Sequence, residues 1–201
     1  MVDAGYEANG AALAEDLRGE GLDPAKLRAI VLTHGHADHV GGALYFREHF
    51  RTPILVGAGD EALLAAGTAI DPLCPTSDRA RDRLESDRAA RFTPFTADRV
   101  IDRAVPLEEV AAIPGTIAPL PGHTAGSLVV TIPGAVFIGD LLRGALVGSS
   151  AELHFYMCDL EDNRRDVREV LERIAPAATT FFTGHFGPVN RDAVAERFPT
   201  P

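Results

Sequence analysis

Six consecutive residues of this 201-residue chain combine four side chains that could bind a metal ion. They stand directly after an apolar run that predicts a buried strand, and they read His34-Gly35-His36-Ala37-Asp38-His39. Neutral imidazoles together with a carboxylate are suitable ligands for zinc or iron. In an extended stretch His34, His36 and Asp38 share one side, while His39 begins the turn into the next helix. The motif therefore predicts that one short loop could serve two metal ions.

Three more potential ligands stand where other predicted strands end, each beside a glycine. They are His123, Asp140 and His185. Taken singly, each could be a capped loop residue or a hydrogen-bonded core residue. Ligands from several strand ends commonly meet at one edge of a layered α/β sheet, so we expect these three to join the histidine loop. Five of the seven histidines then belong to one site.

Helices and short apolar strands alternate along the chain, which predicts a layered α/β fold. Asp23 and Pro24 fit the N-cap and the first position of a short helical turn. The helices are predicted at 7–18, 40–50, 60–66, 163–174 and from 192 onward. The strands are predicted at 29–33, 53–56, 128–132, 135–139 and 179–183. Pro133 and Gly134 would join the third and fourth of these strands as a hairpin.

Residues 68–106 do not show this alternation of helices and strands. We interpret them as an inserted, charged excursion within a single domain spanning 1–201. Arginines alternate there with acidic residues, and prolines flank the segment. Such mixed charge usually marks a solvated helical face, which is the interpretation we favour. The alternatives are a lid that covers the substrate and a surface that binds a partner.

Charge and composition exclude several classes of protein. The formal net charge is −10, from 19 basic and 29 acidic residues, and no basic block could track a phosphate backbone, so nucleic acid is not expected as a partner. No apolar run reaches the ~18–20 residues of a membrane span, and the opening residues lack a signal-peptide pattern, so we expect a cytoplasmic protein. The two cysteines, Cys74 and Cys158, permit one long-range disulfide but form no zinc or redox motif.

Together these motifs resemble those of the metallo-β-lactamase superfamily. The resemblance rests on the histidine loop, on His123 in a Gly-His-Thr-x-Gly-Ser context, and on the pairs Gly-Asp140 and Gly-His185. It implies a four-layer αββα metallo-β-lactamase sandwich, with Asp140 bridging two metal ions. The implied ligands are His34, His36 and His123 for one ion, and Asp38, His39 and His185 for the other.

The start of the chain departs from the superfamily pattern. Asp3, in the sequence Val-Asp-Ala-Gly, is similar to the first superfamily motif, whose aspartate braces the histidine loop and does not bind metal. In the superfamily that motif follows several strands, whereas this sequence begins with it, so we expect an N-terminally shortened sandwich. A missing upstream segment could also have carried an export signal. The spacing from His39 to His123 is longer than in compact members.

The resemblance implies a hydrolase that uses two zinc ions and a metal-bridging hydroxide on a small-molecule substrate. Asp38 would pass a proton to the leaving group. Thr124 and Ser127 would donate hydrogen bonds around His123, or else only satisfy a turn.

Between Asp140 and the next predicted helix, three side chains are expected to line the pocket. They are Arg143, His154 and Tyr156. Arg143 could pair with an anionic group of the substrate. The alternative interpretation is a surface arginine and a packed tyrosine.

The expected substrate is a small ester, lactone, thioester or amide, and a β-lactam has no specific support. Glutathione thioesterases of the superfamily carry a C-terminal helical domain, RNA-processing members carry a basic arm, and lactonases have a tyrosine where this chain has Arg143. One alternative is an iron-dependent oxidoreductase on the same fold, similar to persulfide dioxygenases; His36 argues against a flavodiiron version. The other is a metal-binding protein without turnover. The sequence predicts no oligomeric state.

Overall fold

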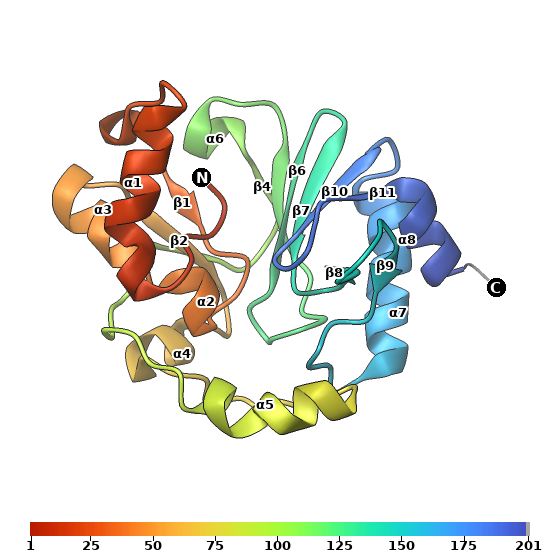
Figure 1. Ribbon diagram of the computed structural model, residues 1–201. Helices are drawn as coiled ribbons and strands as arrows, with labels where there is room; N and C mark the ends of the chain where they lie inside the picture. Colours follow the sequence, from red (N-terminus) through yellow and green to blue (C-terminus); the bar gives the residue numbers. More distant parts are fainter. Residues whose placement is uncertain (200–201) are drawn as a thin grey trace.

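Two β-sheets pack face to face, and helices cover the outer face of each (Figure 1). This computed structural model describes residues 1–199. Helices α1 (Gly10–Gly19) and α3 (Ala43–Phe50) lie against one sheet, and α7 (Leu160–Glu169) and α8 (Arg191–Arg197) lie against the other. The predicted four-layer sandwich of the α/β class is confirmed.

The first half of the chain builds the smaller sheet, whose strands run parallel in the order β1-β2-β3. These strands are β1 (Ile30–Val31), β2 (Ile54–Gly57) and β3 (Arg99–Ile101). Besides α1 and α3, the helices of this half are η1 (Glu7–Asn9), η2 (Pro24–Lys26), α2 (Ala37–Val40), α4 (Glu61–Ala66) and α5 (Asp78–Arg88). The histidine loop follows the carboxyl end of β1.

The second sheet has the order β11-β10-β7-β6-β5-β4. Its strands are β4 (Val105–Pro106), β5 (Thr116–Pro119), β6 (Leu128–Ile132), β7 (Ala135–Gly139), β10 (Thr180–Thr183) and β11 (Val189–Asn190). The remaining elements are α6 (Glu108–Ala111), the π-helical turn η3 (Val170–Ile174), and the paired strands β8 (Arg143–Gly144) and β9 (Ala151–Glu152). β10 pairs parallel with β7, and the other neighbours pair antiparallel.

Side chains of the first sheet alternate between two apolar layers, as expected for strands buried on both faces. Ile30 and Ile54 pack on the helical side, whereas Val31 and Leu55 pack with residues of the second sheet such as Val130. A third buried cluster lies between the second sheet and the helices α7 and α8. Three apolar interfaces therefore hold the four layers together.

The helix predicted at 40–50 corresponds to α3, which begins at Ala43, after Gly41 and Gly42, whereas Val40 is the last residue of α2. A side chain at either position would collide with the backbone of the N-terminal segment, at Glu7 for Gly41 and at Ala4 for Gly42. The two glycines thus permit a close approach that brings the N-terminal segment beside the histidine loop.

Other predicted elements are present with shifted ends. Asp23 caps η2 by accepting a hydrogen bond from the backbone N–H of Ala25 at 3.0 Å. The strand predicted at 29–33 pairs only over Ile30–Val31, although all five residues are buried. Within residues 1–199, no helix has the length and apolar character required to cross a lipid bilayer.

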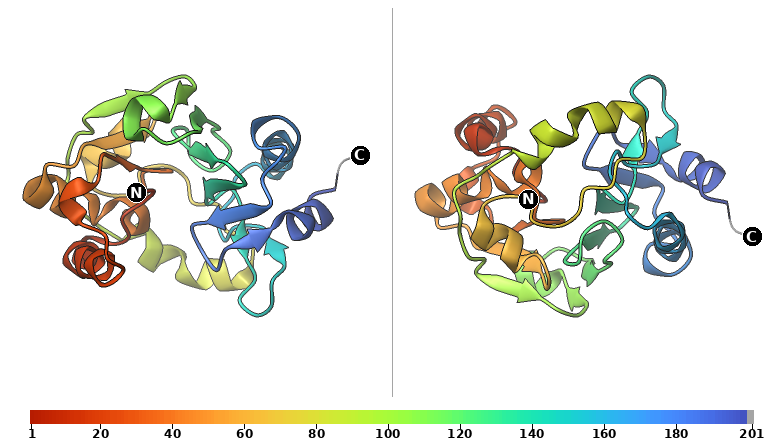
Figure 2. Two further views of the ribbon diagram at one scale, coloured as in Figure 1. Left: turned by 90° about the horizontal axis from the view of Figure 1, so that it is seen from above. Right: turned by 90° about the horizontal axis from the view of Figure 1, so that it is seen from below.

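The excursion predicted at 68–106 is shorter than expected, because 99–106 return to the two sheets as β3 and β4. We call the remaining part, 68–98, the covering segment. Its helix α5 crosses the open edge of the sandwich from the side of α4 to the side of α7 (Figures 1 and 2). One face of α5 is exposed to solvent, and the other turns inward through Ala80 and Leu84.

A disulfide between Cys74 and Cys158 attaches the covering segment to the chain that precedes α7. Beside it, the backbone N–H of Met157 donates to Cys74 O at 2.8 Å, and that of Thr76 donates to Phe155 O at 2.9 Å. The sequence permitted this disulfide but did not predict it, because no local pattern indicates that the two cysteines meet.

Candidate metal centre

The predicted ligands meet where strands of both sheets end at one edge of the sandwich. His123 lies between β5 and β6, Asp140 follows β7, and His185 follows β10. The pairing makes β5, β7 and β10 run in the same direction, so their carboxyl ends share an edge. The histidine loop reaches the same place from β1. All seven predicted ligands therefore contribute atoms to one cluster.

The carboxylate of Asp140 lies in the middle of this cluster. Its Oδ2 atom is 3.4 Å from Nε2 of His39 and of His185, 3.7 Å from Nε2 of His34, and 3.8 Å from Nε2 of His123. Asp140 is 3% exposed, and its Oδ1 atom has no hydrogen-bond partner among residues 1–199. A buried carboxylate that faces four imidazoles in this way is a suitable ligand for a cation.

The predicted ligands form three groups, each of which could hold a metal ion. Within each group the atoms lie within 4.8 Å of one another. The groups are His34, His36 and His123; Asp38, His39 and His185; and His34, His39 and Asp140. The buried Nε2 atoms of His34 and His39 have no hydrogen-bond partner in the described part of the chain, as expected of atoms that bind metal. The nitrogen and oxygen donors suit zinc or iron.

Burial and neighbouring charges set the protonation of the central residues. Burial, with the charge of His39, lowers the pKa of His34 well below its usual value, and burial with His154 does the same for His123. Burial would raise the pKa of Asp140, but the charges of His154 and His39 outweigh it and hold that pKa well below its usual range. His34 and His123 are thus neutral and Asp140 is ionised. Burial would lower the pKa of His39, but the charges of Asp140 and Asp3 outweigh burial and raise that pKa well above its usual value.

The pair formed by Asp38 and His185 lies on the other side of Asp140. Nε2 of His185 is 3.1 Å from Oδ2 of Asp38. Burial would lower the pKa of His185, but hydrogen bonds to Asp140 and Asp38 outweigh burial and raise it to about 10. A bound cation would take the place of the proton that these two carboxylates hold on His185.

Asp3 holds the histidine loop from outside the cluster. Its Oδ1 atom accepts a hydrogen bond from Thr33 N at 2.7 Å, and its Oδ2 atom accepts one from Thr33 Oγ1 at 2.8 Å. Oδ2 also lies 2.8 Å from Nδ1 of His39, an arrangement in which Nδ1–H donates and Nε2 faces the centre. The structure places Asp3 in the bracing position that the family resemblance implies.

Thr124 and Ser127 brace a loop and do not contact the ring of His123. Thr124 N donates to Ser127 Oγ at 2.9 Å, and Thr124 Oγ1 donates to Oδ2 of Asp60 at 2.7 Å. Nδ1 of His123 is buried without a hydrogen-bond partner in residues 1–199. Donation to His123 is therefore not observed, and the two hydroxyls instead form hydrogen bonds within their own turn and to Asp60.

Asp60 is a fully buried carboxylate that the sequence analysis did not select. It accepts hydrogen bonds from Gly35 N at 2.7 Å and from Gly126 N at 2.8 Å, in addition to the one from Thr124. These contacts join the histidine loop to the loop that carries His123. The signal in the sequence was weak, because Asp60 precedes a helix like an ordinary N-cap, although its side chain makes no capping hydrogen bond.

Replacing Asp60 with alanine is expected to lower the free energy of unfolding by about 3 kcal/mol or more, because it leaves two backbone N–H groups and a hydroxyl buried without their acceptor. Denaturant unfolding followed by circular dichroism measures the change. The control is Glu20→Ala, which removes an exposed carboxylate and should cost less than about 0.5 kcal/mol. Equal costs for the two variants would show that Asp60 does not join the loops.

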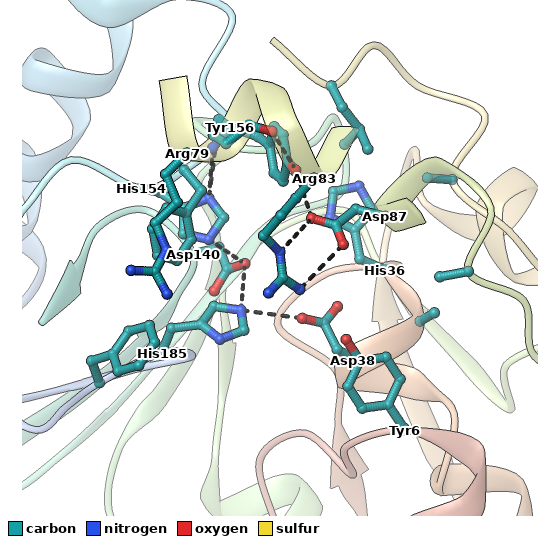
Figure 3. A pocket seen from close by; sticks show the side chains of 17 residues that line it. Tyr6, His36, Asp38, Arg79, Arg83, Asp87, Asp140, His154, Tyr156 and His185 are labelled. Carbon is teal, nitrogen blue, oxygen red and sulfur yellow. Dashed lines mark hydrogen bonds and ion pairs between the residues drawn. The ribbon is translucent and has the colours of Figure 1, made fainter. Parts of the chain in front are cut away.

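A pocket of about 160 Å³ opens beside the centre (Figure 3). Asp38 lines it from α2, Asp140 and His185 line it from the ends of β7 and β10, and Arg79 and Arg83 line it from α5. Its apolar lining comes from Ala37, Ala69, Leu73, Ala80, Phe155 and Phe186. The covering segment therefore forms one wall of the pocket, while most residues of α5 are exposed to solvent.

Of the three residues predicted to line the pocket, His154 and Tyr156 do so and Arg143 does not. The hydroxyl of Tyr156 donates to Oδ2 of Asp87 at 2.6 Å, which ties the chain before α7 to α5. The guanidinium of Arg143 instead lies over the ring of Phe155, 4.5 Å from its centroid. The arginines that face the pocket are those of α5, which sequence reasoning assigned to a solvated face.

A family model described as the metallo-beta-lactamase superfamily matches residues 1–185. Among curated proteins, the probable metallo-hydrolase YflN of Bacillus subtilis (strain 168) is 27% identical over 141 residues, which are 64% of this chain and 48% of YflN. The chain thus spans about half the length of this curated relative.

Solved structures with the same fold include metal-dependent proteins. The BLEG-1 B3 metallo-beta-lactamase superposes with a TM-score of 0.68 at 21% identity, over 98% of this chain and 86% of that chain. TTHA1623, solved in a di-iron-bound form, superposes with a TM-score of 0.67 at 22% identity, over 98% of this chain and 87% of that chain. At these identities the likeness shows a shared fold.

Proposed function

The chain belongs to the metallo-beta-lactamase superfamily, and from that premise we propose that it is a dinuclear zinc hydrolase of a small ester, lactone, thioester or amide. The observation that carries the proposal is the buried carboxylate of Asp140, which lies between two groups of metal-binding side chains. When bound, the two ions would lower the pKa of a water molecule toward ~7 and polarise the electrophilic group of the substrate.

The chain's own residues would position the substrate and handle the proton. Asp38 faces the pocket and lies within hydrogen-bonding distance of His185, so it is placed to pass a proton to a leaving group there. Asp3 and Asp60 hold the ligand-bearing loops in place before substrate binds, which reduces the rearrangement that binding requires.

The pocket supports a small substrate that carries a negative group. Its volume of about 160 Å³ admits a small molecule or the reactive end of a larger one. Arg79 and Arg83 bring positive charge to its wall, where Arg83 also pairs with Asp87 at 3.3 Å, and the rings of Phe155 and Phe186 supply apolar contact. An acyl compound with a carboxylate fits this combination.

Elemental analysis by mass spectrometry tests the metal, and hydrolysis of a panel of esters, lactones, thioesters and amides tests the reaction. Two zinc ions per chain with hydrolysis of at least one class supports the proposal. Iron in place of zinc would favour an oxygen-dependent oxidoreductase. Full metal occupancy without turnover would favour a metal-binding protein, and a chain that takes up no metal would contradict the proposal.

Replacing Arg83 with alanine is expected to raise KM for an anionic substrate about tenfold, equivalent to about 1.4 kcal/mol of binding, because Arg83 faces the pocket. Arg81→Ala is the matched control, since Arg81 lies on the same helix and pairs with the exposed Asp78. It should leave KM and kcat within about twofold. Steady-state kinetics on one substrate compares the two, and equal KM values would remove Arg83 from substrate binding.

Two proposals can be made for the cellular compartment of the protein. The sequence favours a cytoplasmic protein, with export as the alternative if a signal segment lies upstream. The Cys74–Cys158 disulfide favours export, because cytosolic thiols are usually kept reduced.

A further inference from the structure

Two of the seven histidines lie outside the ligand sets considered so far. His49 lies on α3, where its Nδ1 contacts Tyr45 O at the surface. His154 lies in the segment between β9 and α7 and is 3% exposed. Its Nε2 atom is 3.0 Å from Oδ2 of Asp140, which is shorter than the distance from Asp140 to any of the four imidazoles described above. Figure 3 shows the rings of His154 and His185 both reaching the Asp140 carboxylate.

His154 has the features of the predicted ligands. Its Nε2 atom is buried, like the Nε2 atoms of His34 and His39, and the polar atom that it faces is Oδ2 of Asp140 at 3.0 Å. Its ligand atom, one from His123 and one from Asp140 all lie within 4.8 Å of one another. This is the same spacing as in the groups that fit the two metal ions.

The far side of the His154 ring meets the backbone of Tyr156. Nδ1 lies 3.2 Å from Tyr156 O and 3.3 Å from Tyr156 N. If Nδ1 carries the proton and donates it to the carbonyl, Nε2 keeps a lone pair, which is how metal-binding histidines are usually held. If Nδ1 instead accepts from the N–H group, Nε2 carries the proton and donates to Asp140.

The backbone at His154 is held by the covering segment. Thr76 Oγ1 donates to His154 O at 2.7 Å, and the Cys74–Cys158 disulfide closes the same pair of segments. The position of His154 therefore depends on the covering segment, which carries none of the other predicted ligands. A ring held in this way can present Nε2 to the centre with little loss of side-chain entropy.

We propose that His154 is an additional metal ligand, binding through Nε2 on the side of the centre formed by His123 and Asp140. The inference rests on the proposed function only in that the centre binds metal. An ion bound there would have imidazole ligands from both His123 and His154. An extra nitrogen donor favours a divalent transition metal that accepts more than four ligands.

Nuclear magnetic resonance of the ¹⁵N-histidine-labelled, ¹¹³Cd-loaded protein tests the assignment directly. Six histidines are expected to show nitrogen–cadmium coupling, with His154 coupled through Nε2 and protonated at Nδ1, and His49 uncoupled. Five coupled histidines, with His154 protonated at Nε2, would overturn the inference and leave His154 as a hydrogen-bond donor to Asp140. A protein that binds no cadmium or zinc at all would overturn the proposed function as well.

A pair of variants gives an independent readout. His154→Ala is expected to lower the affinity for one of two zinc ions at least about tenfold in competition with a chelator, and to remove one coupled histidine from the cadmium spectrum. His49→Ala removes the exposed histidine and should change neither. Unchanged zinc affinity and an unchanged number of coupled histidines in His154→Ala would overturn the inference while leaving the two-metal centre intact.

Discussion

An Asp140→Ala variant is expected to lose hydrolysis by at least about a thousandfold and to hold fewer than two metal ions per chain. The Asp140 carboxylate faces both ligand groups, with Nε2 of His34 at 3.7 Å on one side and Nε2 of His185 at 3.4 Å on the other. The substitution removes the negative charge of the carboxylate that lies between the two ligand groups. We expect most of the loss on the side of Asp38, His39 and His185.

Metal content after dialysis and turnover of the same substrate measure the two effects of Asp140→Ala. Asp102→Ala is the matched control, because Asp102 is exposed and pairs with its neighbour Arg103. It should retain two ions and full activity. If Asp140→Ala kept both ions at full occupancy, the assignment of Asp140 as the bridging ligand would be wrong.

Removing metal with a chelator is expected to lower the melting temperature by about 8–16 °C. A ligand present at about a thousand times its Kd stabilises the folded chain by about 4 kcal/mol, and each kcal/mol shifts the midpoint of a domain of this size by about 2–4 °C. The physical reason is that buried imidazoles and carboxylates from four strand ends then face one another without the cation that joins them.

Thermal unfolding with chelator, and again after adding back two equivalents of zinc, measures the metal contribution. The melting temperature should return on reloading. The Asp140→Ala variant should respond to chelator less than the unchanged chain, because it holds less metal to begin with. An identical melting temperature with and without chelator would show that the cluster does not bind metal in the folded protein.

The fold could be predicted from the sequence to the level of its layers. Apolar runs of four or five residues separated by helical patterns indicated strands buried on both faces, and Ile30 and Val31 do alternate between two apolar layers. The ends of elements were less predictable. The helix predicted to begin at residue 40 begins at Ala43, after Gly41 and Gly42, which lie against the backbone of the segment that follows Asp3.

The candidate ligands could be selected from local signals. Asp140 and His185 each follow a predicted strand beside a glycine, and strands that run in one direction bring such positions to a single edge. His123 also stands beside a glycine, but the strand before it, β5, was not among the predicted strands. Asp60 and His154 lacked such a signal. Asp60 looked like a helix cap, and His154 stands in a segment with no strand-end pattern.

The sequence by itself determined which residue types stand at the strand ends, and through them the metal-binding chemistry and the layered fold. The tertiary structure decided what those side chains contact. It turned Asp60 toward two loops, placed His154 against Asp140, carried Arg83 over the pocket, and paired Cys74 with Cys158. The physical reason is the separation of the residues along the sequence. Strand and cap signals arise between residues that are neighbours in the chain. The contacts of these side chains join distant segments, which approach only when both sheets and helix α5 pack together.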